Sequence, residues 1–254
     1  MPNQRVNPLI CSVGSTDPTG AAGVGLDLQI YPLLGARGVF AVAAVSAQNE
    51  RKVSKIEPVS AHLIRLQLQA IWAQEPPQAV RIGLLSSAAA IAAVARFMAG
   101  LRRRPPIVLD PVLAASSGAR FAGSAEVAQL RRLFKFATLI TPNAPEAAEL
   151  SGVPVRSAAD AQRAAALLSR YGCSVLVKGG HLQGSRSVDI LLHDGKVTRF
   201  ASARANDRMR GKGCRLAAAI AVELARGRAL EEAVSRGRAF VQRAMRQQRE
   251  LRSR

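Results

Sequence analysis

Short apolar runs alternate along the chain with longer segments of helical character, and this alternation constrains the fold more than any other feature. The apolar runs predict buried strands over residues 9–13, 39–46, 79–82, 107–109, 139–141 and 174–177. Helical periodicity or alanine-rich composition predicts helices over residues 60–74, 88–99, 124–133, 157–171, 214–226 and 230 to about 248. Regular alternation of this kind favours an α/β fold, in which a mostly parallel central sheet carries helices on both faces.

One stretch departs from the alternation. In SVDILLHDGKVTRFAS, residues 187–202, two apolar-rich runs flank an Asp-Gly turn, which is typical of a β-hairpin. No internal repeat, low-complexity linker or clear boundary divides the sequence. We therefore expect residues 1–254 to form one domain, in which about 246–254 are a basic C-terminal tail.

Cysteine usage and hydropathy indicate the compartment. Cys11, Cys173 and Cys214 are widely spaced and form no CxxC pair, which favours reduced thiols over a disulfide framework or a zinc site. No run of about 18 uncharged apolar residues could span a membrane, and no signal peptide is visible. These features predict a cytoplasmic protein that does not act at a membrane.

The net charge is strongly positive, with 36 Lys and Arg residues against 17 Asp and Glu residues, or +19. Such a charge attracts nucleotides, phosphorylated metabolites, nucleic acid and other anions. The basic residues are spread along the chain, without zinc-finger spacing or an aromatic-flanked RNA-binding motif. We therefore expect a solvated arginine-rich surface and no specific nucleic-acid partner.

Small and polar residues gather directly after the predicted strands. The clusters are GSTDPTGAAG (14–23), SAQN (46–49), GLLSS (83–87), DPVLAASSG (110–118), TPNAPE (141–146) and KGGH (178–181). Ligands of open α/β sheets bind outside the carboxyl ends of the strands. We therefore expect these clusters to converge on one site.

The first cluster leads into a helix whose exposed backbone N–H groups could hold a polar ligand. Gly20, Gly23 and Gly25 do not match the G-x-G-x-x-G dinucleotide fingerprint, and the chain contains no P-loop. Asp27 lies inside this helix among apolar neighbours, either as a surface carboxylate or as a pocket carboxylate.

Three other clusters carry charged or metal-binding side chains. Asn143 and Glu146 lie three residues apart, and their oxygens suit Mg²⁺, although the local pattern favours the alternative of a helix N-cap. Asp110 follows a strand, either as a turn residue or as a site residue. Lys178 ends a very apolar strand before two glycines, which indicates a phosphate contact.

The segment GKGC combines flexibility with a helix start. Gly211 and Gly213 let the backbone approach a ligand, and the following helix directs free N–H groups and its positive dipole end toward an anion. We expect the pKa of Cys214 to be depressed there, because the helix N-terminus and Lys212 or Arg215 favour the thiolate. The alternative is that Cys214 is a small residue of a packed helix.

Together these stretches resemble the hydroxymethylpyrimidine/phosphomethylpyrimidine kinases of thiamine biosynthesis, which are members of the ribokinase-like superfamily. The resemblance extends from about Ile10 to Met245 and rests on DPTGAAGVGLDL, AVSAQN, DPVLAASSG, TPNAPEAAEL, VLVKGGH and GKGCRLAAAIA, in that order. It implies a three-layer ribokinase-like α/β fold and a homodimer. It also implies ATP-dependent phosphorylation of 4-amino-5-hydroxymethyl-2-methylpyrimidine, of its monophosphate, or of both, with Mg²⁺.

The resemblance also implies roles for individual residues. The substrate-binding residues would be Asp27, Gln48 and Gly23. The ATP- and phosphate-binding residues would be Lys178, Asn143 and Asp110, with Glu146 as the residue for Mg²⁺. An anion hole, with Cys214 as the base that takes the proton of the hydroxymethyl group, would consist of Gly211, Lys212, Gly213 and Cys214.

Several positions depart from the family pattern. Lys212 stands where threonine is usual, Arg210 where histidine is usual, and RIGLL (81–85) replaces KTGML. Pro32 falls inside the first predicted helix and should bend it or end it early. Two alternatives remain open: a pyridoxal-type kinase of the same superfamily, and a non-catalytic paralogue that binds nucleotide or an acidic partner through its basic surface.

Overall fold

The computed structural model describes residues 7–115, 118–181, 186–203 and 209–252, and a β-sheet forms its centre. The strands are β1 (Leu9–Ser15), β2 (Arg37–Gln48), β3 (Val53–Pro58), β4 (Ala79–Ile82), β5 (Ile107–Leu109), β6 (Leu139–Ile140), β7 (Ser174–Val177), β8 (Arg186–His193) and β9 (Lys196–Ala203). Within the described residues they form a nine-stranded sheet in the order β3-β2-β1-β4-β5-β6-β7-β8-β9. The strands from β2 to β7 in this order pair in parallel, whereas β3, β8 and β9 pair antiparallel at the two edges. The prediction of a mostly parallel sheet is confirmed.

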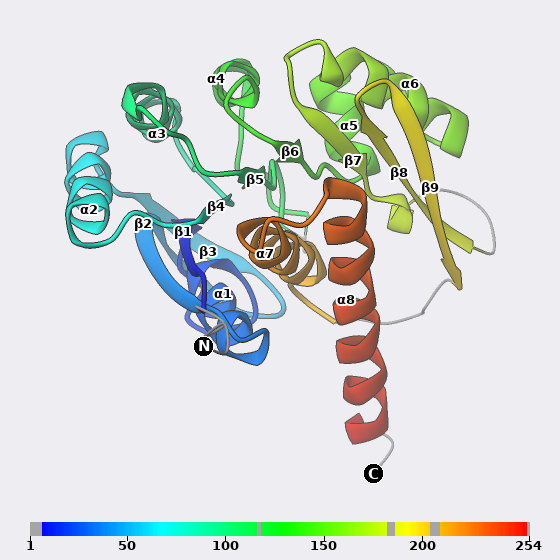
Figure 1. Cartoon of the computed structure of the whole chain (residues 1–254), viewed down its shortest axis with the longest axis horizontal. Helices are drawn as coiled ribbons and strands as arrows, with labels where there is room; N and C mark the ends of the chain where they lie inside the picture. Colours follow the sequence, from blue (N-terminus) through cyan, green and yellow to red (C-terminus); the bar gives the residue numbers. More distant parts are fainter. Residues whose placement is uncertain (1–6, 116–117, 182–185, 204–208, 253–254) are drawn as a thin grey trace, which may run out of the picture.

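Helices cover both faces of this sheet. They are α1 (Gly23–Leu33), α2 (Ala61–Gln74), α3 (Ala88–Gly100), α4 (Ser124–Phe134), α5 (Ala144–Ser151), α6 (Ala158–Ser169), α7 (Lys212–Ala225) and α8 (Leu230–Arg252). Figure 1 shows α1, α7 and α8 on one face, and the other five on the opposite face. Each face has its own cluster of buried apolar side chains. The three-layer α/β fold is therefore confirmed.

Two local signals in the sequence have the expected effect. The hairpin of β8 and β9 turns at Asp194 and Gly195, whose φ values of 48° and 74° lie in the left-handed region that an Asp-Gly turn supplies. Helix α1 ends at Leu33, one residue after Pro32. A proline in the last turn therefore ends the helix early, as predicted.

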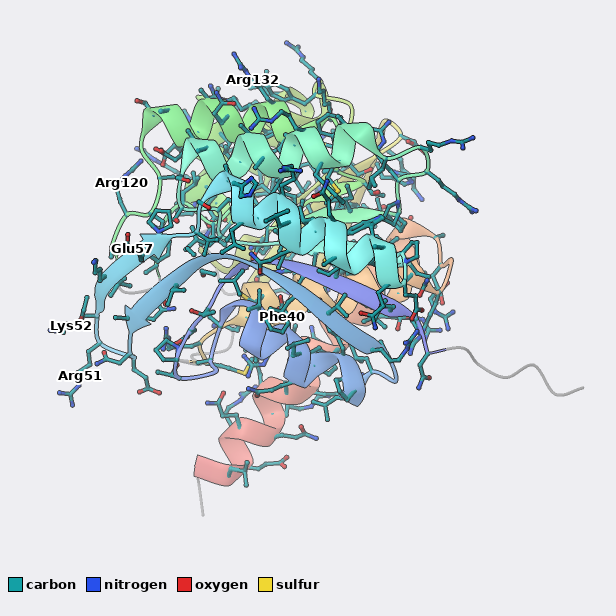
Figure 2. The ribbon with its side chains drawn as sticks, turned by 90° about the vertical axis from the view of Figure 1, so that its left-hand side faces the viewer. Phe40, Arg51, Lys52, Glu57, Arg120 and Arg132 are labelled. Carbon is teal, nitrogen blue, oxygen red and sulfur yellow. The ribbon has the colours of Figure 1, made fainter. Side chains whose placement is uncertain are left out.

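Several elements differ in their bounds from the sequence-based expectation, and one strand was not predicted. Strand β3 was not predicted, because its side chains are exposed or half-buried and no apolar periodicity marks them. Figure 2 shows Arg51 and Lys52 at the tip of the β2–β3 connection, directed away from the helices.

Helix α7 begins at Lys212 rather than at Cys214, so that GKGC includes its first turn. Helix α8 continues to Arg252, past the predicted end near Gln248.

Helix α7 lies between the sheet and α8 (Figure 1). Its buried face is built mainly from small side chains, Ala217, Ala218, Ala219 and Ala221. Small side chains allow a helix to approach a sheet and a second helix closely, and the N-terminus of α7 is thereby held against the sheet. Among the described residues, no helix has the length and apolar character needed to cross a membrane.

Candidate active site

The side chain of Asp110 contacts residues that follow two other strands. It follows β5 directly, and its Oδ1 accepts hydrogen bonds from Thr141 Oγ1 at 3.0 Å and from Lys178 Nζ at 2.7 Å. Thr141 follows β6, and Lys178 follows β7. The predicted convergence of the strand-end clusters is therefore confirmed for these three, although Ser116 and Ser117 of the Asp110 cluster lie outside the described residues.

A buried arginine extends this group toward α1. Arg81 lies in β4 and is 1% exposed. Its guanidinium Nη1 lies 3.3 Å from Asp27 Oδ2, and its Nη2 lies 3.5 Å from Asp110 Oδ2. Sequence reasoning assigned no role to Arg81, although a charged residue inside an otherwise apolar predicted strand was an available signal.

Asp27 is a buried carboxylate and not a surface one, since it is 0% exposed. Ser12 Oγ donates to Asp27 Oδ2 at 2.8 Å, while Tyr31 Oη lies 2.6 Å from the same hydroxyl. Burial raises the pKa of Asp27, against the opposing effects of Arg81 and Ser12. Asp27 Oδ1 has no hydrogen-bond partner among the described residues. A buried acceptor of this kind is suited to a donor group of a ligand.

Gln48 lies at the end of β2, where that strand pairs with Val53 of β3. Among the described residues, no hydrogen bond joins its side chain to Asp27. The grouping of Gln48 with Asp27 in an acceptor pocket thus stays a prediction.

Two glycines bring the N-termini of α1 and α7 close to neighbouring backbone. Gly23, the first residue of α1, has a φ of 66°, and a Cβ there would lie 2.2 Å from the Ser15 carbonyl oxygen. Gly211, directly before α7, has a φ of 69°, and a Cβ there would lie 2.2 Å from the Ala21 carbonyl oxygen. Side chains are excluded at both positions by contact and by backbone conformation. Arg210 joins the same two segments, with Nη2 3.3 Å from Asp17 Oδ2.

The first turn of α7 lies against the pair formed by Asp110 and Lys178. A Cβ at Gly213 would lie 3.1 Å from Lys178 Nζ and 3.4 Å from Asp110 Oδ2. Lys212 precedes it in the same turn and is partly exposed. The structure therefore brings together the predicted anion hole and two of the predicted phosphate-binding residues. Free N–H groups at a helix N-terminus and an ammonium group are both suited to binding phosphate.

The prediction of a depressed pKa for Cys214 is wrong. Burial raises the pKa of the Cys214 thiol, and Asp110 and Asp27 add to this effect. Arg81 and a hydrogen bond with the Gly23 backbone favour the thiolate but do not outweigh burial. The cation that acts on this thiol most strongly is thus Arg81, and not Lys212 or Arg215 as the local sequence suggested.

Asn143 and Glu146 form a capping box at the start of α5. Asn143 Oδ1 accepts from the Glu146 backbone N–H at 2.9 Å, and Glu146 Oε2 accepts from the Asn143 N–H at 2.7 Å. The N-cap interpretation of this pair is therefore confirmed. Burial raises the pKa of Glu146 to about 7, against the opposing charge of Lys178. Glu146 is thus a buried carboxyl close to the phosphate end of the site.

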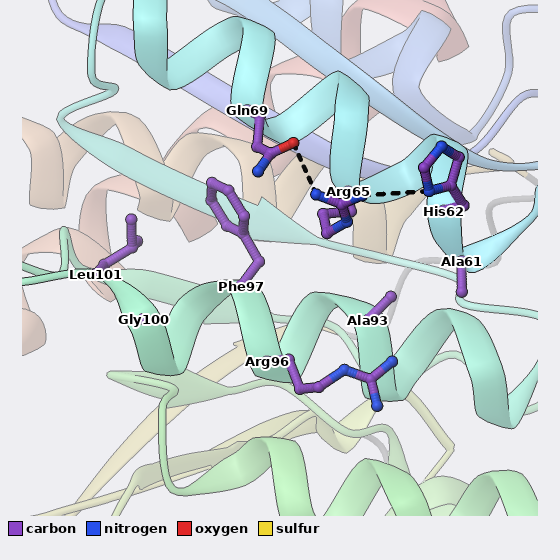
Figure 3. Close-up of a pocket in the computed structure, with 9 residues that line it drawn as sticks. All are labelled: Ala61, His62, Arg65, Gln69, Ala93, Arg96, Phe97, Gly100 and Leu101. Atoms are coloured by element: carbon purple, nitrogen blue, oxygen red, sulfur yellow. Dashed lines mark hydrogen bonds between the residues drawn. The ribbon is translucent and has the colours of Figure 1, made fainter.

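A groove lies elsewhere, between α2 and α3. It has a volume of about 480 Å³, and Figure 3 shows Arg65 held by His62 and Gln69 of its own helix, with Phe97 opposite. None of the predicted site residues lines it. The candidate active site is at the strand carboxyl ends, because the buried ionisable groups converge there and not in the groove.

Comparisons with known proteins show which proteins this chain is similar to. The sequence model for phosphomethylpyrimidine kinase matches residues 17–254. The chain is 37% identical over 239 residues to the hydroxymethylpyrimidine/phosphomethylpyrimidine kinase of Rhizobium meliloti, covering 92% of this chain and 89% of that protein. It is 39% identical over 240 residues to the thiamine biosynthesis bifunctional protein ThiED of Geobacter sulfurreducens, covering 93% of this chain. The chain spans 49% of that bifunctional relative.

Solved structures are also similar to this chain. The phosphomethylpyrimidine kinase of Clostridium difficile has a TM-score of 0.84 at 30% identity, covering 94% of this chain and 99% of that one. An ADP complex of Bacillus subtilis pyridoxal kinase has a TM-score of 0.85 at 26% identity, covering 92% of this chain and 90% of that one.

Proposed function

The chain belongs to the phosphomethylpyrimidine kinase family, and on that premise we propose that it phosphorylates 4-amino-5-hydroxymethyl-2-methylpyrimidine, its monophosphate, or both, with ATP. One observation carries the proposal. A continuous set of buried contacts leads from Asp27 through Arg81 and Asp110 to Lys178, beside the N-terminus of α7. An acceptor bound at Asp27 and a phosphate bound at Lys178 would meet next to Cys214.

The acceptor end of the site is Asp27. Its unpartnered, buried Oδ1 can accept a hydrogen bond from the amino group of an aminopyrimidine. Gly23, at the start of the same helix, keeps the space toward Ser15 free of a side chain. We assign Gln48, at the end of β2, to the opposite side of the ring.

The phosphate end of the site is formed by Lys178 and the first turn of α7. Lys178 Nζ is held at 2.7 Å by Asp110, so that its position is defined before ATP binds. The backbone N–H groups of the segment from Gly211 to Cys214 supply further donors. Phosphoryl transfer depends mainly on positioning and on stabilisation of negative charge, and this end of the site supplies both.

Cys214 is assigned as the base. With the alcohol, the O–H bond of the hydroxymethyl group breaks, its proton passes to the sulfur, and the oxygen forms a bond to the terminal phosphorus of ATP while the bond from that phosphorus to ADP breaks. With the monophosphate, the attacking oxygen belongs to the phosphate group of the acceptor. The sulfur must be a thiolate to accept this proton. Arg81 and the Gly23 backbone are the groups that favour the thiolate at this partly exposed position.

Mg²⁺ fits the phosphate end with few protein ligands. Among the described residues, no three His, Cys, Asp or Glu side chains form a ready-made metal centre. Mg²⁺ does not need one, since it commonly binds through one or two carboxylates, several waters and the phosphates of the substrate. Glu146, with Asp110 and Asn143 nearby in the same group of strand ends, would hold it, and the ion would supply charge neutralisation at the phosphates.

The test is a coupled assay of ATP turnover with the purified chain and three acceptors: the hydroxymethylpyrimidine, its monophosphate and pyridoxal. We expect turnover with one or both pyrimidines. Turnover with pyridoxal alone would replace this proposal with the pyridoxal kinase function, which the similarity to pyridoxal kinases supports. Binding of ATP without turnover of any acceptor would favour a non-catalytic paralogue. We also propose that the protein is a homodimer, which sedimentation of the purified chain would test, and that it is cytoplasmic, which fractionation of the cells that produce it would test.

Loss of the acceptor carboxylate should weaken acceptor binding selectively. In Asp27→Ala, and in Gln48→Ala, we expect a higher KM for the pyrimidine with a nearly unchanged KM for ATP. The loss of one buried hydrogen bond of this kind costs roughly 1–3 kcal/mol. Initial-rate measurements over both substrates give the two KM values independently, and an unchanged acceptor KM in both variants would contradict the assignment.

Lys212 should be tolerated in the anion hole. Its backbone N–H can contact an anion whatever its side chain does, and a flexible lysine stem prefers solvent or an anion to a buried position. We therefore expect Lys212→Thr to change kcat and both KM values only modestly. An inactive natural protein together with an active Lys212→Thr variant would show that the lysine had switched the enzyme off.

A further inference from the structure

Arg81 is a fully buried charge in a strand that otherwise contributes to the apolar core. Its neighbours in β4 are Ala79, Val80 and Ile82, all 0% exposed. Its guanidinium lies between two carboxylates, Asp27 of α1 and Asp110 after β5, at 3.3 Å and 3.5 Å. No other described contact joins the acceptor end of the site to its phosphate end so directly.

The contribution of Arg81 to folding stability does not by itself explain its presence. Both charged groups of a buried ion pair lose their hydration, and well-packed apolar residues in their place often stabilise a protein as much as the ion pair does. The arrangement is also incomplete, because Nε and Nη2 of Arg81 have no hydrogen-bond partner among the described residues. A charge retained under these conditions, inside the group of predicted site residues, indicates a role in the reaction.

The neighbouring backbone leaves room for the guanidinium. A Cβ at Gly83 would lie 2.0 Å from Arg81 Nη1 and 2.7 Å from Arg81 Cζ, so that only glycine is compatible with the arginine where it lies. A Cβ at Gly100, the last residue of α3 and outside the candidate site, would meet nothing within 4 Å. These two glycines therefore differ in what a methyl group would do to Arg81.

We propose that Arg81 is a positioning residue of the phosphoryl transfer, which holds Asp27 and Asp110 in one rigid unit next to Cys214. The inference rests on the proposed kinase function, because Asp27 and Asp110 are its acceptor and phosphate ends. Arg81 fixes the distance between these ends and is a cation that favours the thiolate of the base. Removing it breaks the link between the two carboxylates, although Ser12 still contacts Asp27 and Lys178 still contacts Asp110.

The first test replaces the side chain. In Arg81→Met we expect both a higher KM for the pyrimidine and a lower kcat, with kcat/KM for the acceptor lower by about 10²-fold, since small displacements of reacting groups have effects of this size. Arg81→Lys keeps the charge and should retain an intermediate activity. Guanidinium chloride at low millimolar concentration should restore part of the turnover of Arg81→Ala. A folded Arg81→Met enzyme with unchanged acceptor KM and kcat would overturn the proposal.

The second test moves the guanidinium without removing it. Gly83→Ala should raise the acceptor KM and lower kcat, while the control Gly100→Ala should leave both close to the natural values. Thermal unfolding shows whether each variant is folded, so that a loss of structure is not taken for a loss of positioning. Equal effects of the two substitutions on kcat and KM would contradict the proposal. If Arg81→Met does not fold, this comparison of the two glycine variants is the test of the proposal.

A third measurement does not depend on turnover. Cys214 is the partly exposed cysteine, whereas Cys11 and Cys173 are buried. Alkylation of Cys214 by iodoacetamide, followed by mass spectrometry at fixed pH, should be slower by severalfold in Arg81→Met than in the natural chain. A natural chain without kinase activity but with this difference would reject the proposed function and leave the link between Arg81 and Cys214 standing. An unchanged alkylation rate in a folded variant would reject that link.

Discussion

Replacing Cys214 with serine or alanine is expected to lower kcat by about 10²–10⁴-fold, which is the usual contribution of a general base. Serine has a similar size, but its hydroxyl is a far weaker base than a thiolate. Neither substitution removes the contacts of Asp27 or Lys178, so that the acceptor and ATP should still bind. The measurement is steady-state turnover of both variants, with ligand binding followed separately by calorimetry.

The pH dependence gives an independent check of the same role. Burial raises the pKa of the Cys214 thiol, so the thiolate is the minor form near neutral pH. Because the base acts only when deprotonated, turnover of the natural enzyme should increase with pH until the pH reaches the pKa of the thiol. Cys214→Ser should lose this increase. A fully active Cys214→Ala variant would return Cys214 to the role of a small residue in a packed helix.

Gly179→Ala is expected to destabilise the protein strongly, whereas Gly180→Ala is not. A Cβ at Gly179 would lie 1.9 Å from the carbonyl oxygen and 2.4 Å from the carbonyl carbon of Val188, so that β8 would have to move. A Cβ at Gly180 would meet nothing within 4 Å. Overpacking against well-ordered structure typically costs roughly 1–3 kcal/mol, and contact with backbone leaves little room for relief.

The consequence of Gly179→Ala should extend to the active site. The Gly179 N–H donates to Asp189 Oδ1 at 2.7 Å, and Asp189 Oδ2 is held by Arg238 Nε of α8 at 2.7 Å. Lys178 directly precedes this anchored glycine, so a displaced turn should also raise the KM for ATP. Thermal unfolding should show a Tm lower by roughly 2–4 °C for each kcal/mol lost. Equal Tm values for the two alanine variants would show that β8 accommodates the extra methyl group.

The elements of the parallel sheet could be predicted from sequence because burial on both faces requires continuous apolar runs. Strands β4, β5 and β7 coincide with the predicted ranges, and the β8–β9 hairpin follows its Asp-Gly turn. Strand β3 could not be found this way, since it lies at the edge, pairs with β2 and carries exposed side chains. Its existence depends on a partner strand rather than on its own residues.

The capping box of α5 could be predicted from the local sequence. Asn143 and Glu146 lie three residues apart, which is the spacing that lets each side chain reach the backbone N–H of the other. Metal binding by the same pair also depends on oxygens of distant residues and on the phosphates of a substrate. A local pattern contains no information on them.

The sequence by itself determined the order of the parallel strands and the edge of the sheet at which their polar clusters gather. It could do so because the carboxyl ends of parallel strands share one edge, whatever the details of packing. Only the tertiary structure decided the electrostatics of that site. The pKa of Cys214 is raised by burial and by Asp27 and Asp110, and Arg81 lies between those two carboxylates. Burial and the distances between charges depend on groups far apart in the chain, and local sequence does not specify them.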